Sequence, residues 1–409
     1  MIRLLKMKWL AVPLLGTALL MSSAWADMPE PGKAYVVSPA QLAKPGETPV
    51  TANPSRIRPR PQAVPLRVPK GFKASLFADD LENARWLASS PRGDVVLAQP
   101  NLGRVVQLED KDGDGRAETI SLVAANLNRP HGLAFHNDSL YIADLDHVWK
   151  LPWPFKAGER PQPITAKGAL GDGGGHWTRN LAISPDGKRL YVSIGSRGNI
   201  GEEAPPRATV MAFNIDGSGG RVVASGLRNP VGIAFRPGSN DLWTVVNERD
   251  GLGDGLVPDY LARIDEGGFF GWPYSYIGSN PQPGYEGRRP DLVKAAKVPE
   301  VLFRAHSAPL GLAFYDGAQF PADYRGDAFV ALHGSWNASR AEGYMVARVK
   351  FRNGRPIGGY ESFASGFLIS DGPSIEAWGR PVGLALAKDG SLLIADDAAN
   401  AVWRISYQP

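Results

Sequence analysis

The sequence predicts an all-β protein, a six-bladed β-propeller that follows an export signal. Three observations lead to this prediction: many turn residues, short apolar strands, and a strand–turn–strand unit that recurs six times. The 409 residues include 47 Gly and 35 Pro, and no long helical period follows the N-terminal segment. Because the chain contains no cysteine, a hydrophobic core must stabilise the fold, and thiolate chemistry and cysteine-ligated zinc are excluded.

Residues 1–26 have the pattern of a secretory signal peptide. Three basic residues come first, residues 9–21 are apolar, and Ala24-Trp-Ala26 is a small-x-small cleavage site. The apolar run is too short for a comfortable membrane span, and no later stretch is long and apolar enough. We expect cleavage and a periplasmic protein. An uncleaved N-terminal anchor is the alternative.

The charge of the chain does not favour nucleic acid as a partner. The formal net charge of +4 includes three positive charges of the signal peptide, so the mature chain is nearly neutral. Binding through the phosphate backbone requires a concentrated basic face. The expected partners are therefore small molecules.

Residues 27–69 form a proline-rich N-terminal tail. Seven prolines between residues 45 and 69 alternate with basic residues such as Arg56 and Arg58. Such a stretch favours extended polyproline II structure and cannot build a core by itself. The tail either wraps the following domain or stays mobile.

A repeated unit predicts a propeller domain over residues 70–409. Each unit has a first strand, such as Arg129-Pro-His-Gly-Leu-Ala-Phe, then a tight turn and a second apolar strand, such as Leu190-Tyr-Val-Ser-Ile. The units begin at residues 85, 129, 177, 228, 308 and 380. The first three intervals fit propeller blades of roughly 40–50 residues, and the longer ones predict insertions near 250–300 and 315–375. A β-sandwich with chance sequence echoes is the alternative.

Loops from separate blades meet at one mouth of a propeller, so distant polar residues can surround one ligand. His176 is the first candidate. It ends the run Gly171-Asp-Gly-Gly-Gly-His, in which glycines let the backbone approach a ligand closely. A histidine at such a loop tip can act as a general base near neutral pH. An incidental histidine in a flexible glycine loop is equally compatible with the sequence.

Two further candidates come from the fourth unit. Arg228, followed by Asn229, offers a planar fork for carboxylates and carbonyl oxygens, although taken alone an arginine that caps a strand turn is the simpler interpretation. The loop from Asn247 to Gly255 is rich in acids and glycines. Its carboxylates and carbonyls suit Ca²⁺, which prefers hard oxygen ligands, and an ordinary solvated loop is the alternative.

The run His333-Gly-Ser-Trp-Asn337 follows an apolar strand. Trp336 can stack on a planar ring while its neighbours supply directed polar contacts. Arg380 opens the last unit.

The run Asp110-Lys-Asp-Gly-Asp-Gly115 resembles a calcium loop in its alternating acids. However, the twelfth position of an EF-hand count is Ser121 and no helices flank the run. We interpret it as a turn between blades, with structural Ca²⁺ as the alternative.

Taken together and in this order, these motifs resemble the PQQ-dependent glucose/sorbosone dehydrogenase family, and its sorbosone-dehydrogenase-like branch more than its soluble glucose dehydrogenase branch. The resemblance extends from Gly71 to Tyr407. It is carried by Gly175-His-Trp-Thr-Arg-Asn-Leu, Gly226-Leu-Arg-Asn-Pro-Val-Gly, Asn247-Glu-Arg-Asp with Gly271-Trp-Pro-Tyr, His333-Gly-Ser-Trp-Asn, and Gly379-Arg-Pro-Val-Gly-Leu.

The resemblance implies a role for each candidate. His176 matches the catalytic base, and Arg228 and Asn229 match residues that contact the quinone. The backbone carbonyls of Asp250 and Gly251 fall near those that hold an active-site Ca²⁺. The resemblance also implies that the remaining candidates bind the cofactor: Arg85, His333, Ser335, Trp336, Asn337 and Arg380.

The predicted function is therefore oxidation of a sugar, sugar aldehyde or related alcohol by hydride transfer to PQQ. A cytochrome or a quinone is the expected electron acceptor. Two alternatives remain at this point: a non-catalytic ligand-binding propeller, and a Ca²⁺-dependent hydrolase of the lactonase type. The latter needs carboxylates from several blades on one metal, which the sequence does not show.

Overall fold

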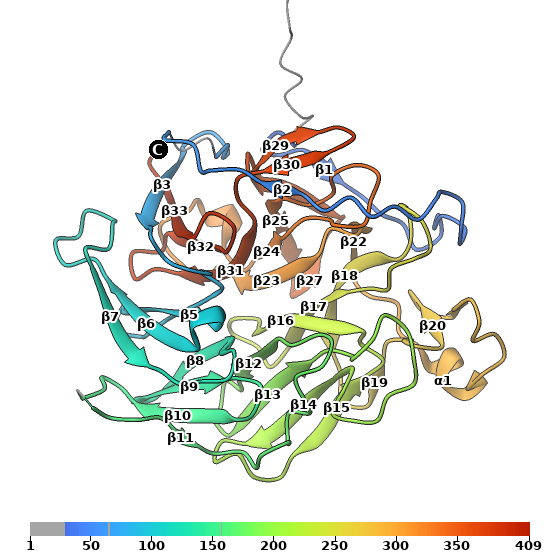
Figure 1. Ribbon diagram of the computed structural model, residues 1–409, viewed down its shortest axis with the longest axis horizontal. Coiled ribbons are helices and arrows are strands. Elements are labelled where there is room, and N and C mark those ends of the chain that lie inside the picture. Colours follow the sequence, from blue (N-terminus) through green and yellow to red (C-terminus); the bar gives the residue numbers. More distant parts are fainter. Residues whose placement is uncertain (1–28, 64–65, 157) are drawn as a thin grey trace, which may run out of the picture.

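The computed structural model describes residues 29–63, 66–156 and 158–409. These residues form six sheets of four or five strands arranged around a common centre (Figure 1). This confirms the predicted all-β propeller. The predicted signal peptide, residues 1–26, lies outside the described residues.

The first three blades follow the chain, and in each of them the first strand is the innermost. The first blade contains β4 (Trp86–Ser89), β5 (Val95–Gln99), β6 (Arg104–Glu109) and β7 (Thr119–Ala124), with the short 3₁₀ helix η1 (Pro100–Leu102). The second contains β8 (Gly132–His136), β9 (Ser139–Ala143), β10 (Val148–Pro152) and β11 (Gln162–Pro163). The third contains β12 (Arg179–Ile183), β13 (Arg189–Ile194), β14 (Thr209–Asn214), β15 (Arg221–Ser225) and β19 (Gly268–Phe269).

The last three blades contain the two insertions. The fourth blade has β16 (Asn229–Phe235), β17 (Leu242–Asn247), β18 (Pro258–Ile264) and β22 (Val301–Ala305). The fifth has β23 (Pro309–Phe314), β24 (Ala328–Leu332), β25 (Met345–Val349), β28 (Tyr360–Ala364) and β1 (Ala34–Tyr35), with η2 (Ala322–Tyr324) between β23 and β24. The sixth has β31 (Pro381–Leu386), β32 (Leu392–Asp396), β33 (Ala401–Tyr407) and β3 (Phe72–Ala78).

Short elements occupy the insertions. The insertion of the fourth blade forms β20 (Ser275–Tyr276), β21 (Asn280–Pro281) and helix α1 (Pro290–Ala295), and β20 and α1 lie at the periphery of the molecule (Figure 1). The hairpin β26 (Phe351–Arg352) and β27 (Arg355–Pro356) extends the fifth blade, and β29 (Leu368–Asp371) and β30 (Ile375–Ala377) precede the sixth. Among the described residues, no helix is both long and apolar enough to cross a membrane.

The six inner strands β4, β8, β12, β16, β23 and β31 contact one another in a closed ring. Glycine allows this close approach. A Cβ on Gly232 would lie 2.6 Å from the carbonyl oxygen of Leu310, and one on Gly311 would lie 2.1 Å from that of Val382. The glycine of the recurring Gly-Leu-Ala-Phe motif is therefore required for packing. Any side chain at this position would push neighbouring blades apart.

The two ends of the propeller domain meet in the sixth blade. Strand β3, from the beginning of the domain, pairs antiparallel with β33 at its end, with Phe72 opposite Tyr407. The outermost strand of the last blade thus comes from the start of the domain. This pairing closes the ring by hydrogen bonds between the two chain ends.

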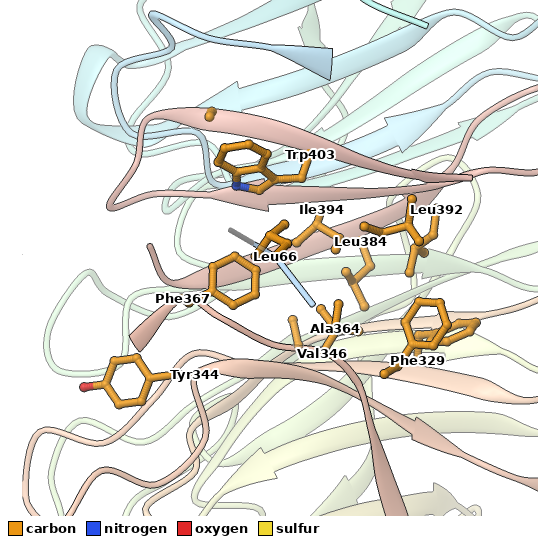
Figure 2. Packing of buried hydrophobic residues seen from close by; sticks show 14 of the residues in the cluster. Leu66, Phe329, Tyr344, Val346, Ala364, Phe367, Leu384, Leu392, Ile394 and Trp403 are labelled. Carbon is orange, nitrogen blue, oxygen red and sulfur yellow. The ribbon is translucent and has the colours of Figure 1, made fainter. Parts of the chain in front are cut away.

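Aromatic and aliphatic side chains fill the spaces between blades. Figure 2 shows one such cluster, which Phe329, Ile394 and Trp403 share with Leu66 of the N-terminal tail. Trp403 is almost fully buried, and its indole N–H donates to Asp396 Oδ2 at 3.0 Å. Burial of such large side chains is the main favourable term in the stability of a protein without disulfides.

The N-terminal tail lies along the propeller. Strand β1 adds an edge strand to the fifth blade through β28, and β2 (Arg56–Ile57) pairs with β30. Between them, the backbone N–H of Asn53 donates to the carbonyl oxygen of Trp336 at 2.8 Å. The sequence left open whether the tail wraps the domain or stays mobile, and the described tail residues wrap the domain.

Candidate active site

The propeller topology brings distant residues to one mouth. In each blade the beginning of the innermost strand pairs with the end of the second strand, as Asn229 does with Asn247 and Pro381 with Asp396. Residues just before the inner strands therefore meet residues just after the second strands. This arrangement assembles the predicted candidates at the same end of the molecule.

His176 is oriented by the loop after β13. Its Nδ1 lies 2.9 Å from the carbonyl oxygen of Ser196 and 3.0 Å from the Ser196 hydroxyl. Because a carbonyl oxygen only accepts, Nδ1 carries the proton and donates to it. Among the described residues Nε2 has no hydrogen-bond partner, so its lone pair is free to accept a proton.

The surroundings keep the His176 ring neutral. Burial and the positive charge of Arg228 lower its pKa to about 4, against the opposing effects of the Ser196 hydrogen bond and the Asp250 carboxylate. At neutral pH the imidazole is therefore unprotonated, which is the form that a general base needs.

Two buried arginines hold the glycine loop that carries His176. Arg179 donates to the carbonyl oxygens of Asp172 at 2.6 Å and His176 at 3.1 Å. Arg207 donates to those of His176 at 3.2 Å and Gly195 at 3.0 Å. The glycine-rich sequence therefore forms a fixed loop, because the two guanidinium groups donate hydrogen bonds to its backbone carbonyls.

Gly175 shows why glycine precedes the histidine. Its φ is +65°, and a Cβ there would lie 1.9 Å from the carbonyl oxygen of Arg197. Only glycine tolerates both conditions.

Arg228 is engaged entirely within the protein. Its Nε donates to the Asn199 carbonyl at 3.1 Å, and its Nη1 to the carbonyls of Glu248 at 2.6 Å and Asn247 at 3.3 Å. Its Nη2 donates to Asn199 Oδ1 and Asp250 Oδ2, both at 3.0 Å. All five N–H groups have acceptors, so Arg228 fixes the loop after β17, and the quinone contact predicted for it requires one donor to change partner.

Asp250 joins two of the predicted loops. Its Oδ1 accepts from Asn337 Nδ2 at 2.6 Å, and its Oδ2 accepts from Arg228. Burial opposes its ionisation, but the hydrogen bond of His306 and the charge of Arg228 lower the pKa of Asp250. Asn337 is thus placed beside Asp250, as a site shared by these loops requires.

The donors around Asp250 do not fit the calcium role predicted for this residue, while the role of the Gly251 carbonyl stays a prediction. The Asp250 carbonyl oxygen accepts from Asn199 Nδ2 at 2.9 Å and Arg249 Nε at 3.2 Å, and both carboxylate oxygens already accept hydrogen bonds. A calcium ion needs free oxygen ligands, whereas N–H donors and two guanidinium groups surround this residue.

A second cluster gathers around Asp397. Its Oδ2 pairs with Arg85, and its Oδ1 lies 2.9 Å from Nε2 of His333. Arg380 donates to the carbonyl oxygens of His333 at 3.1 Å and Gly334 at 2.7 Å. The structure thus brings together Arg85, His333 and Arg380, three predicted cofactor ligands from different blades.

Asp397 is not among the site residues that the sequence predicted. Burial opposes its ionisation, but His333 and Arg85 hold its pKa well below the usual range. A signal was present, because Asp397 follows the second strand of the sixth unit as His333 follows that of the fifth. Comparison of unit ends, rather than unit beginnings, would have found it.

Two predicted cofactor ligands are placed differently from the rest. Ser335 is fully buried, and its hydroxyl accepts the backbone N–H of Glu342 at 3.1 Å while its carbonyl accepts from the Tyr344 hydroxyl. It stabilises its own loop. Trp336 is 50% exposed, so its indole lies at the rim rather than in the interior of the mouth.

Trp177 is a further aromatic residue of the mouth. The guanidinium carbon of Arg129 lies 4.2 Å from the centroid of its ring, and that of Arg85 lies 5.4 Å away. The His131 ring meets Trp177 edge-on at 5.5 Å and lies against Trp86 at 4.7 Å. His131 is completely buried.

Several buried polar atoms near the mouth have no protein partner among the described residues. They are Arg85 Nε, both ring nitrogens of His131, Thr178 Oγ1, Asn180 Nδ2 and Asn229 Oδ1. Buried polar groups normally find a partner, so this concentration is typical of a place that takes waters or a polar ligand. Asn229, predicted to contact the quinone, lies beside His176, since a Cβ on Gly195 would touch both side chains.

The acidic run at 110–115 is separate from this mouth. Asp110, Asp112, Asp114 and Glu118 have carboxylate oxygens within 4.8 Å of one another. They lie in the turn between β6 and β7 within the first blade, so the prediction of a turn between blades is wrong. This turn is at the opposite end of the blade from the mouth. They do not take part in the candidate active site.

With the mouth assembled, the family can be assigned. The family described as TrAA12-like matches residues 66–257 and 292–408. The chain belongs to the TrAA12-like family. The N-terminal tail up to residue 65 and most of the fourth-blade insertion lie outside the match. The finer expectation, a sorbosone-dehydrogenase-like branch, is not part of this assignment.

Curated relatives share much of the chain. An uncharacterized protein of Borreliella burgdorferi is 30% identical over 359 residues, which cover 84% of this chain and 91% of that protein. The pyrroloquinoline quinone-dependent pyranose dehydrogenase of Coprinopsis cinerea is 25% identical over 418 aligned residues, which cover 86% of this chain and 56% of that enzyme. The chain thus corresponds to about half the length of the dehydrogenase.

Solved structures support the fold. The holo form of the PQQ domain of the Coprinopsis cinerea pyranose dehydrogenase superposes with a TM-score of 0.70 at 21% identity, covering 85% of this chain and 98% of that domain. The PQQ-bound aldose sugar dehydrogenase of Streptomyces coelicolor gives a TM-score of 0.58 at 16% identity, covering 83% of this chain and 99% of that enzyme. At these identities the likeness concerns the fold.

Proposed function

We propose that this protein is a PQQ-dependent dehydrogenase that oxidises a sugar, sugar aldehyde or related alcohol and acts in the periplasm after export. The names of the pyranose and aldose sugar dehydrogenases among its relatives support this reaction class. The observation that carries the proposal is His176, a neutral base with a free Nε2 in a mouth rich in guanidinium groups.

The mouth has the chemistry that PQQ requires. PQQ is a planar aromatic tricarboxylate, which suits guanidinium forks, stacking partners and a flat pocket. Arg85 and Arg380 offer the guanidinium groups, and Trp177 adds an indole that contacts both Arg85 and Arg129. When bound, PQQ supplies the carbon that accepts a hydride.

His176 takes the proton from the substrate hydroxyl, or from the hydrate of an aldehyde. The Ser196 carbonyl holds the Nδ1 proton, so Nε2 is the accepting atom, and the resulting imidazolium is stabilised by that same hydrogen bond. Arg179 and Arg207 keep the loop in place during this transfer.

Arg228 acts on His176 through its charge, which lowers the pKa of the ring. Its guanidinium group also donates hydrogen bonds to the backbone carbonyls of Asn247 and Glu248. Because the oxygens of Asp250 accept hydrogen bonds, we assign no step to calcium. The electrons leave to a cytochrome or quinone acceptor.

The experiment that tests the proposal combines cofactor binding with turnover. Purified protein is titrated with PQQ, followed by absorbance, and then assayed for dye reduction with a panel of sugars, sugar aldehydes and alcohols. His176→Ala should still bind PQQ and should lose turnover by about 100-fold or more. His136→Ala, at the far end of β8, is the matched control and should behave as wild type.

Two results would refute the proposal. Full turnover by His176→Ala would remove the base from the mechanism. Lactone hydrolysis that persists without PQQ, together with an absence of dye reduction, would identify a hydrolase instead.

A further inference from the structure

Arg129 occupies an exposed position at the mouth, immediately before Pro130 and strand β8. Its guanidinium carbon lies 4.2 Å from the centroid of the Trp177 ring. Trp177 follows His176 directly in the chain, so Arg129 is close to the proposed catalytic base although it comes from a different blade.

The backbone around Arg129 is fixed on both sides. The N–H of Asn128 donates to Asp144 Oδ2, and the N–H of His131 donates to the carbonyl of Ala143, both at 2.9 Å. Arg129 itself has φ +55°, a left-handed conformation that is unfavourable for a side chain of this size. Strained backbone of this kind is concentrated at functional sites.

The charge of Arg129 is not balanced by the protein. Among the described residues it forms no ion pair and no hydrogen bond, whereas the neighbouring Arg85 pairs with Asp397. Partial burial of its side chain and the charge of Arg85 together lower the pKa of Arg129. Two guanidinium groups, those of Arg85 and Arg129, thus lie beside the Trp177 indole, and the Asp397 carboxylate neutralises only the first. The remaining positive charge favours the binding of an anion.

The contact with Trp177 leaves the N–H groups of Arg129 available. The guanidinium carbon lies over the indole ring, and a π contact of this kind uses none of the N–H groups as hydrogen-bond donors to an acceptor atom. The contact therefore orients the fork without occupying it, and such a fork matches a carboxylate through two parallel hydrogen bonds.

We propose that Arg129 binds a carboxylate of PQQ through its free N–H edge while Trp177 holds its guanidinium group. This inference rests on the proposed function and adds an anion contact from the second blade to those expected of Arg85 and Arg380. Trp177 is a positioning residue in this arrangement.

Direct binding tests the inference without reliance on turnover. The full-length mature protein, freed of cofactor, is titrated with PQQ and followed by absorbance and by quenching of tryptophan fluorescence. Arg129→Gln should raise the Kd by about tenfold or more, because a charge-assisted fork is lost. Arg129→Lys should show a smaller increase, because it keeps the charge without the fork. Arg325→Gln, an exposed arginine near η2, should match wild type.

The trimethyl ester of PQQ separates charge recognition from structural damage. It lacks the carboxylates, so wild type and Arg129→Gln should bind it equally. A Kd for PQQ that is unchanged in Arg129→Gln would overturn the inference and leave the proposed function intact. An equal loss of affinity for acid and ester would also overturn it. If wild type binds no PQQ, the proposed function fails and the inference fails with it.

Discussion

His176 illustrates how much chemistry a few atoms determine. The Ser196 carbonyl fixes the tautomer, burial and Arg228 lower the pKa of the ring, and Arg179 and Arg207 hold the loop. The glycine run before His176 indicated a loop at a ligand. The sequence did not reveal the two arginines beneath it, because their bonds to backbone carbonyls depend on the folded path of the loop.

The pH dependence of turnover follows from this environment. The pKa of His176 is lowered to about 4 from 6.5, so the neutral form persists as pH falls through the range where a free histidine becomes protonated. We expect kcat/KM to decline only as the pH approaches 4, in a pH–rate profile at saturating PQQ. An acid limb centred near 6.5 would contradict the assigned environment.

Asp397 provides a stability prediction at the same scale. Its lowered pKa means that ionised Asp397 stabilises the fold above the pKa of an unfolded aspartate, about 4, and that this contribution decreases as pH falls further. Asp397→Asn should reduce the free energy of unfolding by about 3 kcal/mol at pH 7. Chemical denaturation measures this change, and a variant as stable as wild type would contradict the role of the Arg85–Asp397–His333 cluster.

At the scale of elements, the repeat was predictable because each inner strand meets the same requirement. Gly232 and Gly311 lie against the backbone of the next inner strand, so the same short motif recurs in every unit where that contact is made. The outermost strand of the last blade was not predictable in the same way. Strand β3 belongs to the sixth blade by pairing with β33, and this long-range pairing leaves no periodic trace in the sequence.

Substitution of an inner glycine tests this packing. A Cβ at Gly232 would lie 2.6 Å from the Leu310 carbonyl oxygen, and a backbone atom cannot move away without shifting a blade. Gly232→Val should lower the melting temperature by several degrees, as overpacking of a core costs about 1–3 kcal/mol. Gly372→Ala is the control, because nothing lies within 4 Å of a Cβ there. Equal melting temperatures for the two variants would contradict the account of the ring.

At the scale of the whole molecule, the propeller brings residues that are far apart in the sequence close together at one mouth. His176, Arg228, His333 and Arg380 come from four different units, and the structure places each beside the end of a second strand. The family motifs made most of these residues predictable. Arg129 and the buried unpartnered atoms were not, since their importance depends on neighbours from other blades.

The N-terminal tail gives a prediction at this scale. It bonds to the loop of Trp336 through Asn53, whose N–H reaches the Trp336 carbonyl and whose Nδ2 lies 3.4 Å from the Ser339 carbonyl. Asn53→Pro removes the backbone donor and should loosen this loop, with a rise in KM of several-fold and little change in kcat. Steady-state kinetics with the best substrate measures both, and an unchanged KM would show that the tail does not support the rim.

The most direct test of the central claim is the stoichiometry of PQQ binding by absorbance titration, compared between wild type and an Arg85→Gln/Arg380→Gln variant. The account predicts one PQQ per chain for wild type and a Kd at least about 100-fold weaker when both guanidinium groups are removed. A folded double variant that retains wild-type affinity would contradict the claim that these blades converge on a planar, negatively charged cofactor.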